Sequence, residues 1–196
     1  MASEMKLSTR SDKGGSVPRQ KLSKRELRDA FGLFATGVTV VTAVSPENDP
    51  VGTTANSFTS VSLEPPMLLW CLANSSSARA AFAVDAPFAV HVLSHDQRDL
   101  ALHFARRSRD KFEIDSHWRA QPFPPQVAEA LCRFDCLVTA VHPAGDHVII
   151  VGEVTAITRH PGDSPLLFFS GRFGKFLSDR GSPHVDVWHS WRDEWV

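Results

Sequence analysis

The feature that most constrains the fold of this chain is a series of apolar, β-branched stretches that no regular helices separate. The first, Val38–Val44, has the two-residue period of a strand and runs into Pro46–Pro50, which has the composition of a turn, so a hairpin should follow. Strands without regular helical crossovers predict a mainly β protein, an antiparallel barrel with flanking helices rather than a doubly wound parallel sheet. The later strand patterns are Met67–Leu72, Phe88–Leu93, Phe134–Val141 and Val148–Ile157, with the tight turn Ala144–Asp146 joining the last two.

Three helices are expected beside these strands. The segment Ser23–Glu26 fits a capping box, and apolar residues follow at helical spacing, so the first helix should cover residues 24–36 and stop at Gly37. The second is expected over Ser77–Val84. The third should begin at a further capping box, Ser94–Gln97.

The length and the apolar content indicate one domain with tails. A chain of 196 residues that is 42% hydrophobic can bury one sizeable core but is short for two. Residues 1–21 are rich in Lys, Arg, Ser and Gly and offer little to bury, which predicts a disordered tail. The domain is expected over residues 22–180. In the C-terminal tail, 181–196, Trp188, Trp191 and Trp195 either dock on a partner or pack on their own barrel.

Charge and cysteine content exclude several classes of partner and compartment. The 21 basic and 22 acidic residues nearly cancel, so the chain has no excess of positive charge for nucleic acid or an anionic membrane. No apolar stretch reaches the roughly 18 residues of a membrane span, and the N-terminus lacks the apolar core of a signal peptide. Three cysteines, an odd number, favour a reducing compartment. We therefore expect a cytoplasmic protein that binds neither nucleic acid nor membrane.

Several common catalytic signatures are absent from the sequence. It has no Gly-x-Gly-x-x-Gly, no P-loop, no His-Glu-x-x-His and no Gly-x-Ser-x-Gly. Cys132 and Cys136 are four residues apart, roughly 13 Å along a strand, too far to share one metal ion, and are interpreted as core thiols. No metal site is expected.

The segment Gly52–Trp70 closely resembles the signature of the short-chain flavin reductases, whose fold is the FMN-binding split barrel. The resemblance covers about residues 24–175 and implies an antiparallel split β-barrel that binds FAD or FMN. It continues through Phe31–Val40, Ser76–Ser77, Gln97–Ala105, Lys111–Phe112, Gly145–His147, Pro165–Leu166 and Gly171–Phe173.

The residues of this segment have the chemistry that a flavin ring needs. Six small polar side chains stand within ten positions, and the edge of an isoalloxazine requires several short donors and acceptors. An ordinary Ser/Thr-rich turn is the alternative. The six are Thr53, Thr54, Asn56, Ser57, Ser60 and Ser62.

Two further segments suit a flavin phosphate. The run Asn74–Ser77 precedes the second expected helix and would offer hydroxyls and the positive end of a helix dipole, although it could be an N-cap only. Cations follow the third helix at Arg106, Arg107, Arg109 and Lys111, and the sequence leaves open which of them points inward.

The resemblance implies that one residue lies near the nicotinamide. At one other position the chain departs from the family pattern. His147 closes a Gly-Asp-His motif that in this family lies by the NAD(P)H site. Phe173 stands where tyrosine is common, so a packing role is kept and a hydroxyl contact is lost. Carried over position by position, the cofactor-binding residues are Thr53, Thr54, Ala55, Asn56, Ser57, Ser60, Val61, Ser62, Cys71, Leu72, Ala73, Asn74, Ser76, Ser77, Phe104, Ala105, Arg106, Lys111 and Phe173.

The resemblance implies an NAD(P)H-dependent flavin reductase that supplies reduced FAD or FMN to a partner flavin-dependent monooxygenase. It also implies a homodimer with the flavin at the subunit interface. Two alternatives are a split-barrel oxidase that retains its flavin, similar to pyridoxamine-phosphate oxidase, and a flavin-binding protein without enzymatic turnover. The sequence does not distinguish FMN from FAD or NADH from NADPH.

Overall fold

A computed structural model of the chain describes residues 21–108, 111–112, 118–119, 124–161 and 164–177. The expected C-terminal tail and nearly all of the expected N-terminal tail lie outside these residues.

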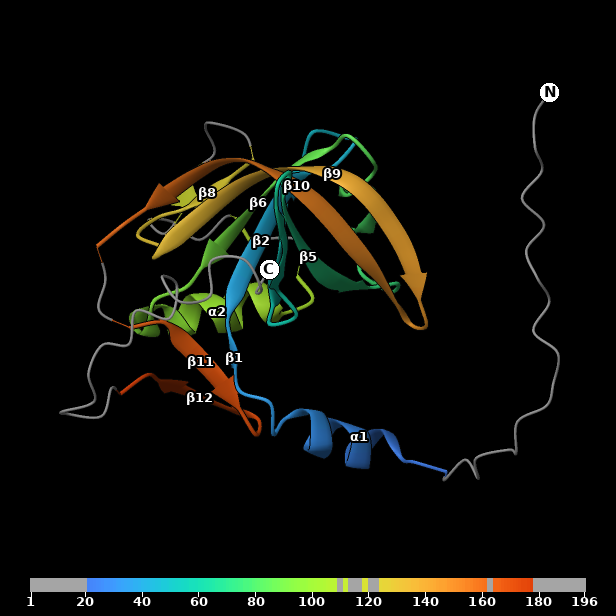
Figure 1. Cartoon of the computed structure of the whole chain (residues 1–196), viewed down its shortest axis with the longest axis vertical. Coiled ribbons are helices and arrows are strands. Elements are labelled where there is room, and N and C mark those ends of the chain that lie inside the picture. Colours follow the sequence, from blue (N-terminus) through green and yellow to red (C-terminus); the bar gives the residue numbers. More distant parts are fainter. Residues whose placement is uncertain (1–20, 109–110, 113–117, 120–123, 162–163, 178–196) are drawn as a thin grey trace, which may run out of the picture.

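The body of the molecule is a seven-stranded antiparallel sheet with the strand order β3-β2-β6-β9-β10-β5-β4 (Figure 1). The expected mainly β, antiparallel class with flanking helices is confirmed. The ladder does not close on itself, since β3 and β4 are its two edges. Its strands are β2 (Thr39–Val44), β3 (Pro50–Ala55), β4 (Thr59–Leu63), β5 (Pro66–Ala73), β6 (Pro87–Val92), β9 (Cys132–Ala144) and β10 (His147–Arg159).

The remaining described strands form two small sheets. In the first, β11 (Leu166–Phe169) lies between β1 (Thr36–Gly37) and β12 (Arg172–Lys175). In the second, β7 (Trp118–Arg119) pairs with β8 (Gln126–Val127).

The first helix begins as expected and ends early. In α1 (Lys24–Phe31) both hydrogen bonds of the capping box of Ser23 are present. The helix stops at Gly32, whose N–H donates to Arg28 O at 2.9 Å, so the predicted end at residue 36 is wrong. The physical reason is a competing pairing, because Thr36 and Gly37 adopt extended backbone and join β11.

The second expected helix is wrong. Only a three-residue 3₁₀ turn, η1 (Arg79–Ala81), forms in this region. Phe82 is drawn into the core against Trp70, with ring centroids 4.9 Å apart, and the N–H of Asp85 donates to Val138 O at 2.8 Å. These tertiary contacts end the turn before an α-helix can propagate.

The third expected helix is present and begins at its capping box. Ser94 and Gln97 make both reciprocal hydrogen bonds, and the 3₁₀ turn η2 (His95–Gln97) leads into α2 (Arg98–Ala105). No helix among the residues described above is long and apolar enough to cross a lipid bilayer.

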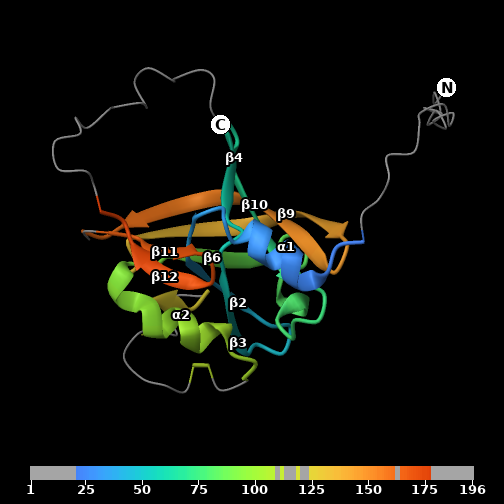
Figure 2. The ribbon, with the colours of Figure 1, turned by 90° about the horizontal axis from the view of Figure 1, so that it is seen from below.

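The packing of α2 on β3 determines where the functional cavity lies. An ideal Cβ at Gly52 would come within 2.6 Å of Phe104 Cε1, so β3 can approach the helix this closely only with glycine at this position. The hydroxyl of Thr54 donates to Ala101 O at 2.6 Å and ties the same strand to the same helix. As a result α2 lies against β2 and β3, away from the β9–β10 hairpin (Figure 2).

A fully buried histidine makes the stability of the fold depend on pH. His91 lies on β6, with Nδ1 3.1 Å from Val40 O and no hydrogen-bond partner for Nε2 among the described residues. Loss of hydration on burial lowers the pKa of His91 to about 4 from its usual value of 6.5. The imidazole is therefore neutral in the folded protein at neutral and mildly acidic pH.

We expect the protein to lose stability between about pH 6.5 and pH 4. In that window the unfolded chain binds a proton at His91 and the folded chain does not, which favours unfolding by up to roughly 3 kcal/mol at the acid end. Urea unfolding across this pH range should show the loss in the wild type and a flatter profile for His91→Asn, which keeps a donor toward Val40. His160→Asn, an exposed control, should retain the wild-type profile. If the free energy of unfolding changes equally with pH in His91→Asn and in the wild type, this assignment is wrong.

Candidate functional site

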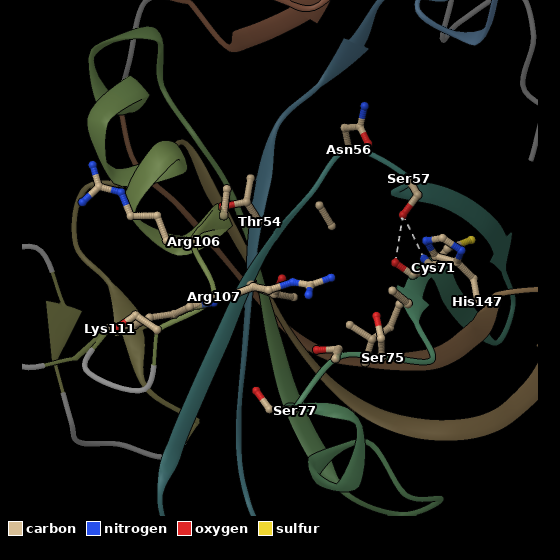
Figure 3. A pocket seen from close by; sticks show the side chains of 17 residues that line it. Thr54, Asn56, Ser57, Cys71, Ser75, Ser77, Arg106, Arg107, Lys111 and His147 are labelled. Atoms are coloured by element: carbon tan, nitrogen blue, oxygen red, sulfur yellow. Dashed lines mark hydrogen bonds between the residues drawn. The ribbon is translucent and has the colours of Figure 1, made fainter. Parts of the chain in front are cut away.

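A cavity of about 590 Å³ opens where the end of β3, the end of β5 and the C-terminus of α2 meet (Figure 3). Its lining is rich in hydroxyl groups and contains three cations, and no aspartate or glutamate is among the described residues that line it. Such a surface suits a polar ligand that carries negative charge. The lining residues are Thr53, Thr54, Ala55, Asn56, Ser57, Cys71, Leu72, Ala73, Ser75, Ser76, Ser77, Ala105, Arg106, Arg107, Ser108, Lys111 and His147.

One serine joins the end of β3 to β5 at this cavity. The hydroxyl of Ser57, just after β3, accepts the main-chain N–H of Cys71 on β5 at 2.9 Å. It also lies 3.4 Å from Cys71 O, and both contacts are drawn in Figure 3. The side chain thus supplies the hydrogen bonds that a neighbouring strand would otherwise supply, and it holds the cavity wall in shape.

The ammonium of Lys111 is held at the opposite side of the cavity by two main-chain carbonyls. Its Nζ donates to Gly52 O and to Phe104 O, each at 2.8 Å. Partial burial lowers the pKa of Lys111 below its usual value. An ammonium has three N–H donors, one more than these carbonyls take, so Lys111 can also bind an anion in the cavity.

The turn between β9 and β10 places His147 at the cavity edge. Gly145 has φ +67°, a conformation that favours glycine. The turn is tied to the loop after β5, because Asn74 donates from its main-chain N to Asp146 O at 2.9 Å and from Nδ2 to Gly145 O at 3.0 Å. His147 is thereby fixed beside the chain segment that follows β5.

The side chains of Asp146 and His147 form a close pair. Asp146 Oδ1 lies 2.7 Å from His147 Nδ1, and this hydrogen bond holds the pKa of the Asp146 carboxyl below its usual range. The pair orients the imidazole and leaves Nε2 as the ring nitrogen that a ligand can reach.

The structure brings together most of the residues that the sequence singled out. Those that line the cavity are Thr53, Thr54, Ala55, Asn56, Ser57, Cys71, Leu72, Ala73, Ser76, Ser77, Ala105, Arg106, Lys111 and His147.

The other predicted residues lie outside this cavity. Ser60, Val61 and Ser62 are on β4, which projects from the body of the molecule in Figure 2. Phe104 is buried in the core, and its carbonyl accepts from Lys111. Asn74 bonds to the β9–β10 turn, and Phe173 packs against Phe168. The flavin role of these residues stays a prediction.

Three lining residues were missing from the predicted set: Ser75, Arg107 and Ser108. Ser75 lies inside the polar run Asn74–Ser77, and Arg107 belongs to the cation run after α2, so the signals were present but did not single them out. Arg109, also in that run, lies outside the described residues. The expected helix dipole at residue 77 is absent, because η1 is a single 3₁₀ turn.

Comparisons with known proteins agree with this chemistry. The model of the family described as "Flavin reductase like domain" matches residues 31–176. The chain is 48% identical over 154 residues to FMN reductase (NADH) SmoA of Agrobacterium fabrum, covering 79% of this chain and 87% of SmoA. It is 34% identical over 182 residues to the flavin-dependent monooxygenase reductase subunit HsaB of Rhodococcus jostii, covering 92% and 89% of the two chains.

Among solved structures, the chain is similar to the NADH:FAD oxidoreductase SgcE6 of Streptomyces globisporus in complex with NAD and FAD fragments. The TM-score is 0.70 at 40% identity, and the match covers 83% of this chain and 95% of SgcE6. Two other relatives, 48% and 46% identical, are longer proteins, and this chain spans 42% and 57% of their lengths.

Proposed function

The chain belongs to the flavin reductase-like family, and from that premise we propose that it uses NADH or NADPH to reduce FMN or FAD and supplies the reduced flavin to a flavin-dependent monooxygenase. The observation that carries the proposal is the cavity, whose lining pairs hydroxyls with cations and contains no carboxylate among the described residues. The relative with the name FMN reductase (NADH) supports the reduction of flavin by a nicotinamide nucleotide. The relative with the name flavin-dependent monooxygenase, reductase subunit, supports the supply of reduced flavin to a monooxygenase.

The residues present fit a flavin in one orientation. Figure 3 shows Lys111 and Arg106 on one side of the cavity and Ser57, Cys71 and His147 on the other. The cations suit the ribityl phosphate, and the hydroxyl and main-chain groups suit the polar edge of the isoalloxazine. A cavity volume near 590 Å³ lies within the range typical of cofactor sites.

A bound flavin supplies a hydride acceptor at N5, so the protein needs no nucleophile or metal of its own. What the chain supplies is position: the nicotinamide must be held with its C4 about 3–3.5 Å from that acceptor. His147 is suited to this task because it stands at the cavity edge with its ring oriented by Asp146. The hydroxyl of Ser57 keeps the wall beside it in place.

We expect His147→Ala to lower kcat/KM for NADH at least tenfold while flavin affinity stays within twofold of wild type. The measurement is anaerobic stopped-flow absorbance with NADH and added FMN or FAD, in which the wild type should reduce the flavin catalytically. His142→Ala, an exposed histidine on β9 outside the cavity, is the matched control. An unchanged kcat/KM in His147→Ala would show that this histidine is only a turn residue.

Lys111→Met should weaken FMN binding at least tenfold, about 1.4 kcal/mol, because it removes the cation that two carbonyls hold in place. Riboflavin, which lacks the phosphate, should bind the variant and the wild type about equally. Titration of flavin fluorescence measures both affinities, with Arg172→Met on β12 as the control. If riboflavin and FMN lose affinity to the same extent, Lys111 shapes the cavity and does not bind the phosphate.

We further propose that two copies of the chain associate. No residue of α1 is buried, and large apolar side chains are exposed at its end, in the turn that follows it and on β4: Phe31 73%, Leu33 68%, Phe34 77% and Leu63 72%. Apolar surface of this kind favours a protein partner, and a second copy would cover it.

Sedimentation velocity should give the mass of two chains for the wild type. Replacing Phe31 and Phe34 with Ser should shift the species toward one chain, since both side chains contribute to the exposed apolar surface. The control replaces Leu102 and Val84, which are exposed apolar residues elsewhere on the molecule, with Ser. A wild-type mass of one chain at micromolar concentration would contradict the proposal.

A reducing, cytoplasmic location is the compartment that we propose. Cys71, Cys132 and Cys136 are all free thiols. Cys132 and Cys136 lie on the same strand, β9, as expected, and burial raises the pKa of Cys136 to about 12. Cys136 is thus a buried core thiol as expected, whereas Cys132 is only partly buried and lies outside the core, so the expectation of two core thiols is wrong for Cys132.

A further inference from the structure

A second cavity, of about 680 Å³, adjoins the first. Four residues line both cavities: Ser76, Ser77, Ser108 and Lys111. The shared wall is the part of the first cavity where the cations suit the flavin phosphate. A ligand that continues beyond that phosphate would therefore pass Lys111 and enter the second cavity.

The second cavity differs from the first in its chemistry. Its lining includes two carboxylates, those of Glu47 and Asp49, whereas the first has none among the described residues. It also has more apolar surface. The remaining lining residues are Ser45, Pro50, Val51, Gly52, Ala78 and Phe112.

The two carboxylates stand on a turn that is held by its own hydrogen bonds. Ser45 donates from its main-chain N to Asp49 O at 2.8 Å, and its hydroxyl accepts the N–H of Asp49 at 3.2 Å. The N–H of Asn48, which has φ +68°, donates to Ser45 O at 2.9 Å. The main chain of the turn between β2 and β3 is thus preorganised beside the cavity.

Resting on the proposed function, we propose that the second cavity binds the adenylate half of FAD and that the protein selects FAD over FMN. FAD is FMN extended at its phosphate by an adenylate, so its second phosphate would meet Lys111 at the junction. The ribose hydroxyls and the adenine amino group are donors, and the carboxylates of Glu47 and Asp49 are acceptors. The faces of adenine are apolar, which suits Val51, Ala78 and Phe112.

Net charge does not distinguish the two flavins, because the terminal phosphate of FMN and the diphosphate of FAD each carry about two negative charges at neutral pH. The selection therefore rests on the contacts that the adenylate half makes in the second cavity.

The test is a titration of FMN and FAD without any nicotinamide nucleotide, followed by flavin fluorescence. The wild type should bind FAD at least tenfold more tightly than FMN. In the double variant Glu47→Ala/Asp49→Ala, the FAD affinity should fall at least fivefold while the FMN affinity stays within twofold or rises. Asp99→Ala/Glu153→Ala changes the net charge equally at exposed positions outside both cavities and should bind both flavins as the wild type does.

Equal affinities for FMN and FAD in the wild type, with no loss of FAD affinity in the double variant, would overturn the inference. So would a double variant that raises KM for NADH but keeps its FAD affinity, because the cavity would then take the adenylate half of the nicotinamide nucleotide. In either case catalytic reduction of FMN by NADH would leave the proposed function standing. A wild type that reduces neither flavin would refute the proposed function itself.

Discussion

The placement of the Lys111 ammonium between the carbonyls of Gly52 and Phe104 is the constraint on which phosphate binding at the proposed site depends. It requires β3 and α2 to approach closely, and that approach requires the absence of a side chain at Gly52, where any Cβ would meet the Phe104 ring. Phe104 is itself fixed by burial and by an edge-on contact with Phe112 at 5.2 Å between ring centroids. One contact between a strand and a helix thus closes the core and places a positive charge between two cavities.

Around this charge the molecule separates two chemical environments. The first cavity combines cations and hydroxyls and suits a phosphorylated ring system, whereas the second has carboxylates and apolar side chains and suits an uncharged adenosine. The site does not depend on a buried acid or base for the chemistry, because the hydride acceptor comes with the flavin. Because the flavin supplies the reacting group, the protein has only to bind and orient the ligands, and the polar side chains at the site are accordingly mostly small hydroxyls.

The sequence predicted the strands and the capping boxes well because both are local patterns. The period of two in β2 and the reciprocal bonds of Ser23 and Ser94 need no knowledge of distant residues. The errors arose where tertiary contacts decide. Thr36 and Gly37 pair with β11, more than 120 residues away, and Phe82 packs against Trp70, so neither segment follows its helical pattern.

The same distinction holds for the site. The resemblance and the density of polar residues identified Asn56, Ser57 and His147, all of which line the first cavity. The inward position of Lys111 depends on Gly52 and Phe104 together, and no local pattern shows it. The second cavity depends on the β2–β3 turn lying beside the loop after β5, so the sequence alone could not distinguish FAD from FMN.

The central claim is that reduced flavin leaves this protein and serves a separate oxygenase. The most direct measurement places the protein and a flavin-dependent monooxygenase on opposite sides of a dialysis membrane that passes only small molecules, under low oxygen, with NADH and flavin on the reductase side. Oxygenated product on the far side of the membrane is the predicted result. Product that forms only when the two proteins share a compartment would contradict the claim, because the flavin would then be transferred by contact between the proteins.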